Sequence, residues 1–113
     1  MKETYTQYVE KYRDKYPPHD IPTTIQIPNG NIGISKYDEC VYYYRYIKET
    51  DDYEWHRLDG PAFINDYETK WYINDYDVTD EIIVWAKDND IDLGNLTDED
   101  KALIKLIWSD YGK

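Results

Sequence analysis

Residues 23–35 read Thr-Thr-Ile-Gln-Ile-Pro-Asn-Gly-Asn-Ile-Gly-Ile-Ser, so an Asn-Gly pair stands between two short runs rich in isoleucine. Asn-Gly between such runs is the strongest short-range signal for a β-hairpin, because both residues tolerate the positive φ of a tight turn. Residues 40–47 read Cys-Val-Tyr-Tyr-Tyr-Arg-Tyr-Ile, and this aromatic and β-branched density suits a strand with one buried face. Together the three runs predict an antiparallel sheet.

Strand and turn signals continue beyond these runs. Residues 53–57 form another candidate strand, and Asp-Gly-Pro at 59–61 predicts a turn before residues 62–64. Residues 70–73 read Lys-Trp-Tyr-Ile and are expected to form the last strand. The middle of the chain, about residues 23–74, is therefore predicted to be an antiparallel meander.

Helical periodicity flanks the predicted sheet on both sides. Tyrosines and Val9 fall at helical spacing over about residues 2–16, and Pro17-Pro18 ends this amphipathic helix. A second helix is expected over about residues 80–88, with Thr79 or Asp80 as its cap.

A third helix is expected over about residues 98–110, opened by a capping box that begins at Thr97. Its expected apolar face is Ala102, Leu103, Leu106, Ile107 and Tyr111, widened by Ile104 and Trp108. The predicted fold class is α+β, with an N-terminal helix, a central antiparallel β-meander and two C-terminal helices in one domain, residues 1–113.

Composition limits the function. Lys plus Arg number 13 against 24 Asp plus Glu, a net charge of −11, which argues against direct binding of nucleic acid or an anionic membrane through a basic surface. With 14 Tyr and 4 Trp, the chain is too aromatic for a disordered acidic tail. The single cysteine, Cys40, excludes an intrachain disulfide, and no run is long enough for a membrane helix. We expect a soluble cytoplasmic protein with no membrane partner.

Residues 55–62 read Trp-His-Arg-Leu-Asp-Gly-Pro-Ala, and residues 71–74 read Trp-Tyr-Ile-Asn. This pattern resembles a repeat of tailed-phage and giant-virus proteins that reads His-Arg-x-Asp-Gly-Pro-Ala, a short strand, a turn and Trp-Tyr-x-Asn-Gly. One copy covers about residues 53–76. The resemblance implies a phage origin and a β-rich module, and it assigns no catalytic residue. Asp66 and Asp75 replace the turn glycines of the repeat, so tighter or different turns are expected.

The motif also invites a chemical interpretation. His56 and Arg57 with Asp59 resemble a catalytic or phosphate-binding set, because imidazole titrates near neutrality and guanidinium binds oxyanions. The structural interpretation is favoured, since neighbouring strand residues point to opposite faces and Asp59 is placed to cap its own turn. The second histidine, His19, has no ligand spacing to His56, so no transition-metal site is expected.

Residues 88–99 resemble a calcium loop of the EF-hand type in part. Counted from Asp88, acids fall at positions 1, 3, 5 and 12, but Leu93 stands at position 6, where the loop requires glycine. Asn95 stands at position 8, where an apolar residue is needed. An acidic loop between helices, with Gly94 as its turn, is the favoured interpretation, and calcium binding is the alternative.

Enzymatic activity and a cofactor are not expected. Neither Ser35 nor Ser109 has a neighbouring His or Lys in a known catalytic arrangement, and the acidic surroundings of Cys40 should raise its thiol pKa. Carboxylate pairs of the glycosidase kind arise by chance among 24 acids. Nucleotide sequestration on Tyr and Trp rings is a further hypothesis, opposed by only three arginines and no Gly-rich phosphate loop.

The acid is concentrated in one segment. Residues 66–100 hold twelve acids and two lysines, a local balance of −10, and we interpret the acids as a candidate partner-binding surface. They are Asp66, Glu68, Asp75, Asp77, Asp80, Glu81, Asp88, Asp90, Asp92, Asp98, Glu99 and Asp100. Carboxylates imitate phosphates because they accept bidentate arginine bonds.

The favoured hypothesis is therefore a phage-encoded acidic protein that inhibits a host nucleic-acid-handling or defence protein in the cytoplasm of an infected bacterium. Its partner would be a host protein with a basic surface, and it would not bind nucleic acid directly. The alternative is a non-enzymatic accessory or virion-associated interaction module, whose acidity serves solubility.

Overall fold

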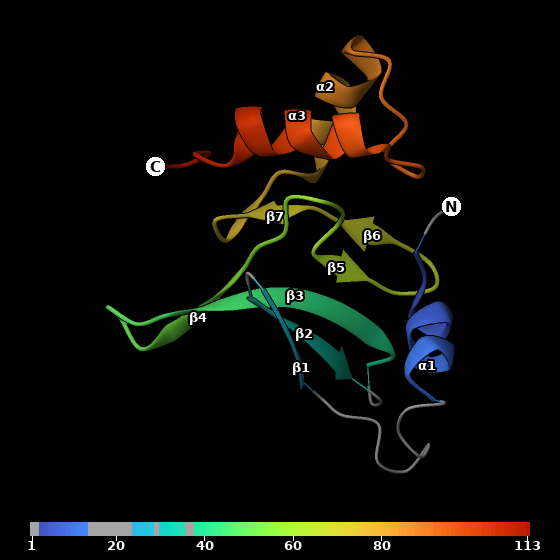
Figure 1. Ribbon diagram of the computed structural model, residues 1–113, viewed down its shortest axis with the longest axis vertical. Helices are drawn as coiled ribbons and strands as arrows, with labels where there is room; N and C mark the ends of the chain where they lie inside the picture. Colours follow the sequence, from blue (N-terminus) through green and yellow to red (C-terminus); the bar gives the residue numbers. More distant parts are fainter. Residues whose placement is uncertain (1–2, 14–23, 29, 36–37) are drawn as a thin grey trace.

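The computed structural model describes residues 3–13, 24–28, 30–35 and 38–113, and Figure 1 shows its ribbon. The N-terminal part contains α1 (Tyr5–Arg13), β1 (Thr24–Ile27), β2 (Gly30–Ser35), β3 (Cys40–Ile47) and β4 (Asp52–Trp55). The C-terminal part contains β5 (Phe63–Ile64), β6 (Thr69–Lys70), β7 (Tyr72–Ile73), β8 (Tyr76–Asp77), α2 (Thr79–Asp88) and α3 (Asp98–Trp108). The α+β fold with an antiparallel meander is confirmed.

Strand β3 is the centre of the large sheet, whose order is β1-β2-β3-β5-β6. One edge of β3 pairs with β2, and the other edge pairs with β5 near its beginning and with β4 near its end. Between β4 and β5 the chain leaves β3 after His56, whose N–H donates to the Tyr43 carbonyl at 3.1 Å. It returns at Ala62, whose carbonyl accepts from the Tyr43 N–H at 2.7 Å. Residues 57–61, inside the repeat-like motif, therefore form an excursion from this edge.

One face of the large sheet carries the first hydrophobic cluster. Helix α1 packs on this face through Tyr8, whose ring meets Tyr43 edge to face with 6.3 Å between centroids. Cluster one consists of Tyr8, Ile32, Ile34, Val41, Tyr43, Ala62 and Ile64. Alternate residues of a strand point to opposite faces, which places Val41 and Tyr43 in this core and Tyr42 and Tyr44 on the other face.

The β7–β8 hairpin and the two C-terminal helices form the second cluster. It consists of Trp71, Ile73, Val78, Ile82, Ile104 and Trp108. Figure 1 shows β7 between the large sheet and the layer of α2 and α3. The helices meet through Trp85 and Trp108, which pack edge to face with 5.9 Å between ring centroids. We call the part built from β7, β8, α2 and α3 the helical lobe.

The turn of the β7–β8 hairpin lies in the segment that resembles the phage repeat, and Asp75 stands where that repeat has glycine. Asn74 and Asp75 are its two central residues, and their φ angles are +52° and +71°. Positive φ at both positions is what a type I′ turn requires, and Asn and Asp tolerate it better than most residues. The other departure, at residues 65–66, lies in a longer turn in which the Asn65 side chain accepts from the Tyr67 and Glu68 N–H groups.

Several element boundaries differ from the sequence prediction. Residues 70–73 are not one strand, because Lys70 ends β6 in the large sheet while Tyr72 begins β7 in the small one. Trp71 lies between them, where its N–H donates to the Thr79 hydroxyl at 3.0 Å and its carbonyl accepts from the Val78 N–H at 2.9 Å. Strand β8 was not expected, and pairing therefore extends to residue 77. For the first helix, residue 2 and residues 14–16 lie outside the described residues.

Of the predicted caps of the two C-terminal helices, one is confirmed and the other is wrong. The capping box at Thr97 is confirmed, since its hydroxyl accepts from the Asp100 N–H and the Asp100 carboxylate accepts from the Thr97 N–H. The prediction that Thr79 or Asp80 caps α2 is wrong, because Val78 holds the cap position and makes no side-chain cap bond. The Thr79 hydroxyl is already engaged, since it donates to the Asp77 carboxylate at 2.6 Å.

The expected apolar face of α3 is also partly wrong. Ile104 and Trp108 are buried, but Leu106 is 78% exposed and Ile107 is 51% exposed. The buried stripe is thus rotated from the expected one, and α3 ends at residue 108 rather than near 110.

Candidate functional site: the acidic surface of the helical lobe

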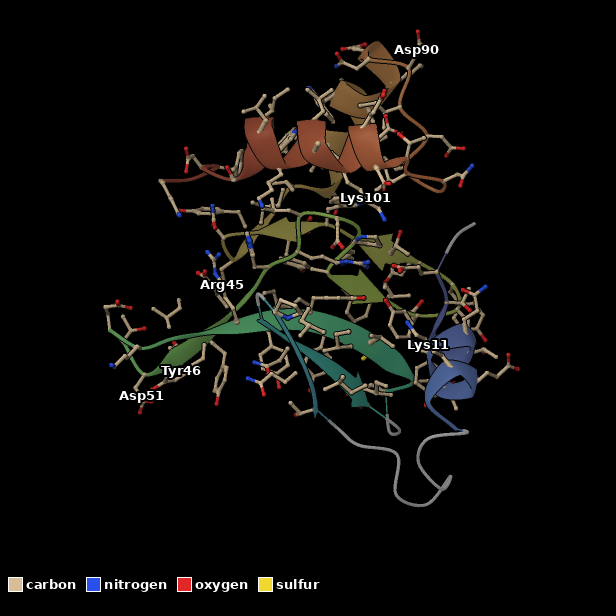
Figure 2. The ribbon with its side chains drawn as sticks, viewed as in Figure 1. Lys11, Arg45, Tyr46, Asp51, Asp90 and Lys101 are labelled. Atoms are coloured by element: carbon tan, nitrogen blue, oxygen red, sulfur yellow. The ribbon has the colours of Figure 1, made fainter. Side chains whose placement is uncertain are left out.

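The twelve predicted acids fall into three groups in the structure. Asp66 and Glu68 lie on the β5–β6 turn, Asp75 and Asp77 lie on the β7–β8 hairpin, and the other eight belong to α2, α3 and the loop between them. Eleven of the twelve are exposed, and Asp100 is half-buried. Figure 2 shows Asp90 at the end of the helical lobe farthest from the large sheet. The structure therefore places ten of these acids on the helical lobe, eight of them on its helices and the loop between them, and leaves Asp66 and Glu68 on the β5–β6 turn.

Five of the twelve carboxylates serve the fold itself. Asp66 accepts from the Thr6 N–H at 3.0 Å and from the Thr6 hydroxyl at 2.6 Å, which fixes the start of α1 to the β5–β6 turn. Asp77 accepts from the Thr79 N–H at 3.1 Å and from its hydroxyl at the start of α2. These hydrogen bonds favour the ionised form and lower the pKa of both Asp66 and Asp77.

The other three structural acids act in turns and caps. Asp75 accepts from the Trp55 N–H at 3.1 Å, which joins the β7–β8 turn to β4. Asp92 accepts from the Gly94 N–H at 2.9 Å, and Asp100 completes the capping box of α3. These three side chains are therefore engaged within the chain.

Seven acids remain as a candidate contact surface. They are Glu68, Asp80, Glu81, Asp88, Asp90, Asp98 and Glu99, and none of them makes a hydrogen bond or an ion pair through its side chain with the described residues. Four of the seven lie in the first turns of α2 and α3, where the positive end of the helix dipole stabilises carboxylates. Six of the seven belong to the helical lobe.

Exposed apolar side chains lie among these acids. Val84 on α2 is 60% exposed and Ile83 is 49% exposed. Residues four apart are neighbours on a helix surface, so Val84 lies between Asp80 and Asp88, with Glu81 one turn away. We call Asp80, Glu81, Ile83, Val84 and Asp88 the α2 surface. Sequence reasoning identified its acids but did not single out its exposed aliphatic residues.

The repeat-like motif is held by a separate polar network centred on Arg57. Its guanidinium, with 9% of the side chain exposed, donates to the two oxygens of Glu3 at 2.6 and 3.2 Å. It also donates to the Asp59 carboxylate at 2.8 Å and to the Pro61 carbonyl at 3.1 Å. The guanidinium carbon lies 3.9 Å from the centroid of the Tyr43 ring. These contacts join the N-terminal segment, the 57–61 excursion and β3.

Electrostatic shifts follow from this network. Burial alone would lower the pKa of Arg57, but hydrogen bonds to Glu3 and the nearby Tyr43 outweigh it and raise the pKa. Burial raises the pKa of Tyr43 to about 12, and it raises the pKa of Tyr8 further. The two tyrosine hydroxyls are hydrogen-bonded to each other. Both tyrosines are therefore neutral at physiological pH.

His56 diverges from Arg57, as expected. Its Nδ1 accepts from the Asn74 N–H at 2.9 Å, which requires a neutral imidazole. Burial, with Arg45 and Lys113 nearby, lowers the pKa of His56 to about 4. Asp59 differs from the prediction in part, because its carboxylate binds Arg57 as well as its own backbone N–H. The motif residues thus have structural partners.

The other candidate sites can also be placed. Cys40 is buried, and burial together with Asp38 raises its thiol pKa, as the sequence predicted. In the 88–99 loop, the Asp92 carboxylate accepts a hydrogen bond from the Gly94 N–H. Over the described ranges, no group of three or more His, Cys, Asp or Glu side chains is arranged to hold a metal ion. His19 lies outside the described residues.

Comparisons with known proteins add nothing to these observations. No protein-family model, no curated protein sequence and no solved structure matches this chain. Within residues 3–13, 24–28, 30–35 and 38–113, no helix combines the length and the apolar character needed to cross a bilayer.

Proposed function

We propose that this protein is a phage-encoded, non-enzymatic inhibitor that binds a basic surface of a host nucleic-acid-handling or defence protein through the acidic surface of its helical lobe. The observation that carries the proposal is the α2 surface, where exposed Ile83 and Val84 lie among three carboxylates without intramolecular partners in the described chain. A small apolar centre with a charged rim is the common anatomy of a protein interface.

The chemistry of this surface fits a basic partner. Carboxylates accept paired N–H bonds from arginine as phosphates do, and arginines are abundant where proteins bind nucleic acid. Two helices hold the acids at fixed separations, which reduces the entropy lost on binding. A chain of net charge −11 also attracts a cationic protein over several ångströms, which speeds association and makes it weaken with salt.

Two further considerations support the phage context and the inhibitory role. The resemblance of residues 53–76 to the phage and giant-virus repeat supplies the phage context. Inhibition follows from the competition that carboxylates would offer to phosphates in a basic groove.

A matched pair of charge-reversal variants tests the proposal. Glu81→Lys with Asp88→Lys changes the net charge by +4 on the α2 surface, and Glu10→Lys with Glu49→Lys makes the same change at exposed positions on α1 and the β3–β4 turn. Each protein serves as bait for a bacterial lysate, with low-salt and high-salt washes and mass spectrometry of the eluate.

We expect the wild type and the control pair to retain a basic nucleic-acid-handling protein that high salt releases, and the Glu81/Asp88 pair to lose it. Equal retention by all three proteins, or no specific retention by the wild type, would contradict the proposal. Circular dichroism of both pairs confirms that the fold is intact.

A second candidate function is favoured by the open face of the large sheet. Tyr42, Tyr44, Tyr46, Tyr53, Trp55 and Phe63 form a continuous row of rings there, with neighbouring centroids 5.4 to 6.0 Å apart. Tyr46 is 48% exposed and Tyr53 is 59% exposed. Such a face suits an accessory or virion-associated interaction module. Replacing Tyr46 and Tyr53 by Ser would abolish partner retention in that case and leave it unchanged under the first proposal.

A further inference from the structure

The space between the helical lobe and the large sheet contains a groove of about 580 Å³. Its walls come from the β1–β2 hairpin, from residues 43–44 of β3, from the 56–59 segment and from residues 101–105 of α3. Ile27, Pro28, Leu58 and Ala102 supply apolar walls. Ligand sites in proteins commonly have this volume and a mainly apolar lining with a few polar groups.

The charge of this groove is opposite to that of the whole chain. Its lining includes four cations, Lys11, Arg57, Lys101 and Lys105, and one carboxylate, Asp59, a balance of +3 in a protein of net charge −11. Arg57 binds both Glu3 and Asp59, and Asp59 also interacts electrostatically with Lys101, so the positive charge of the groove comes from its lysines. Figure 2 shows Lys101 on the side of α3 that faces the sheet and Lys11 on α1 beside β3.

Two of these lysines are available for a ligand. Among the described residues, the side chains of Lys101 and Lys105 donate no hydrogen bond and form no close ion pair, although Lys101 is half-buried. They are four residues apart on α3, so their side chains leave the helix on one side, one turn apart. The neutral His56 imidazole, whose Nδ1 is an acceptor, carries its proton on Nε2 and adds a donor to the lining.

We infer that this groove binds a nucleotide, with the phosphate between Lys101 and Lys105 and the base against the apolar wall of Ile27, Pro28 and Leu58. A compact ammonium group binds phosphate as a point charge, and a flat base suits an apolar wall. A longer nucleic acid is disfavoured, because its additional phosphates would meet the surrounding acidic surface. Although the chain has only three arginines, these lysines supply cations for a phosphate. The inference does not depend on the proposed function, since the groove and the α2 surface are different sites.

Isothermal titration at low ionic strength with AMP, GMP, CMP and UMP, and with the four corresponding nucleosides, tests this inference. At least one monophosphate should bind more than about tenfold tighter than its nucleoside, because the lysines interact with the phosphate. Lys101→Met and Lys105→Met should each weaken that binding about tenfold. Lys48→Met, at an exposed position in the β3–β4 turn outside the groove, is the control and should bind like the wild type.

Three results would overturn the inference. They are no detectable binding of any of the four monophosphates at millimolar concentration, equal affinity for a monophosphate and its nucleoside, and wild-type affinity in both α3 variants. Thermal unfolding of the three variants separates a lost ligand contact from a lost fold, and the two α3 positions give two independent readings.

Discussion

Substitution of Asn74 is the sharpest single test of how the large sheet and the helical lobe are joined. Its side chain donates to the carbonyls of Ser109 and Tyr111, at 3.0 and 2.8 Å, beyond the end of α3. The side-chain oxygen accepts from the Arg45 guanidinium at 2.6 Å, and its backbone N–H donates to His56. The residue is buried and has a φ of +52°. One side chain therefore connects β3, the β7–β8 turn and the C-terminal segment.

The cost of Asn74→Ala can be worked from these contacts. Two neutral hydrogen bonds contribute about 1 kcal/mol each, and the bond to the charged Arg45 contributes about 1.5 to 3 kcal/mol. Holding alanine in the left-handed region adds about 1 kcal/mol. Water will replace part of the lost bonding, so we expect the free energy of unfolding to fall by about 3 to 5 kcal/mol, a large part of the stability of a small domain.

Asn74→Gly separates the cost of the lost hydrogen bonds from the cost of the positive φ, because glycine keeps the backbone conformation and loses the same side-chain hydrogen bonds. It should be about 1 kcal/mol less destabilised than Asn74→Ala. Urea unfolding followed by tryptophan fluorescence measures both values, since Trp71, Trp85 and Trp108 lie in or against cluster two. A loss below about 1 kcal/mol for Asn74→Ala would refute the linking role. A glycine variant less stable than the alanine variant would refute the turn argument.

Two further predictions concern the repeat-like motif. The folded-state pKa of His56, about 4, lies below its ordinary value of 6.5, so the unfolded chain binds the proton more readily and stability should fall as pH falls from about 6.5 to 4. We expect the free energy of unfolding, measured by urea titration, to fall by about 1 to 2 kcal/mol across that range in the wild type and by less in His56→Gln. An equal fall in the variant would contradict the lowered pKa of His56. Arg57→Lys retains the charge but cannot match Glu3 and Asp59 together, so we expect a loss of about 2 to 3 kcal/mol and a Tm about 10 °C lower by calorimetry. A Tm within about 2 °C of the wild type would show that the Arg57 network is dispensable.

The sequence predicted the elements whose causes are local. The β1–β2 hairpin follows from an Asn-Gly pair, and the start of α3 follows from the capping box at Thr97. Both signals lie within a few residues of the structure they specify. The exposure of the helix-start acids was predictable for the same reason.

Features that depend on distant partners were not predicted. Trp71 interrupts the expected last strand because its N–H binds the hydroxyl of Thr79, eight residues away. Arg57 was recognised as part of a motif, but its main partner, Glu3, is 54 residues earlier in the chain. Periodicity identified α3 as amphipathic yet did not show that Leu106 faces outward, because the packing partner of the helix selects among adjacent apolar stripes.

The candidate site also has features that the sequence located and features that only the fold shows. Composition located the acids, but only the fold separates Asp66 and Asp77, which hold helix starts, from Asp80 and Asp88, which frame Val84. The lysines of the groove stand four apart in the sequence, a visible signal. Their position opposite the β1–β2 hairpin depends on the tertiary packing of α3.

We propose that the α2 surface competes with nucleic acid for a basic partner. Fluorescence anisotropy of a labelled oligonucleotide bound to the protein captured from the lysate measures this competition directly. We expect the wild type to displace the oligonucleotide with a potency that falls as salt rises, and the Glu81→Lys, Asp88→Lys variant to require at least about tenfold more protein. A ternary complex in which the partner holds the oligonucleotide and this protein together would contradict it.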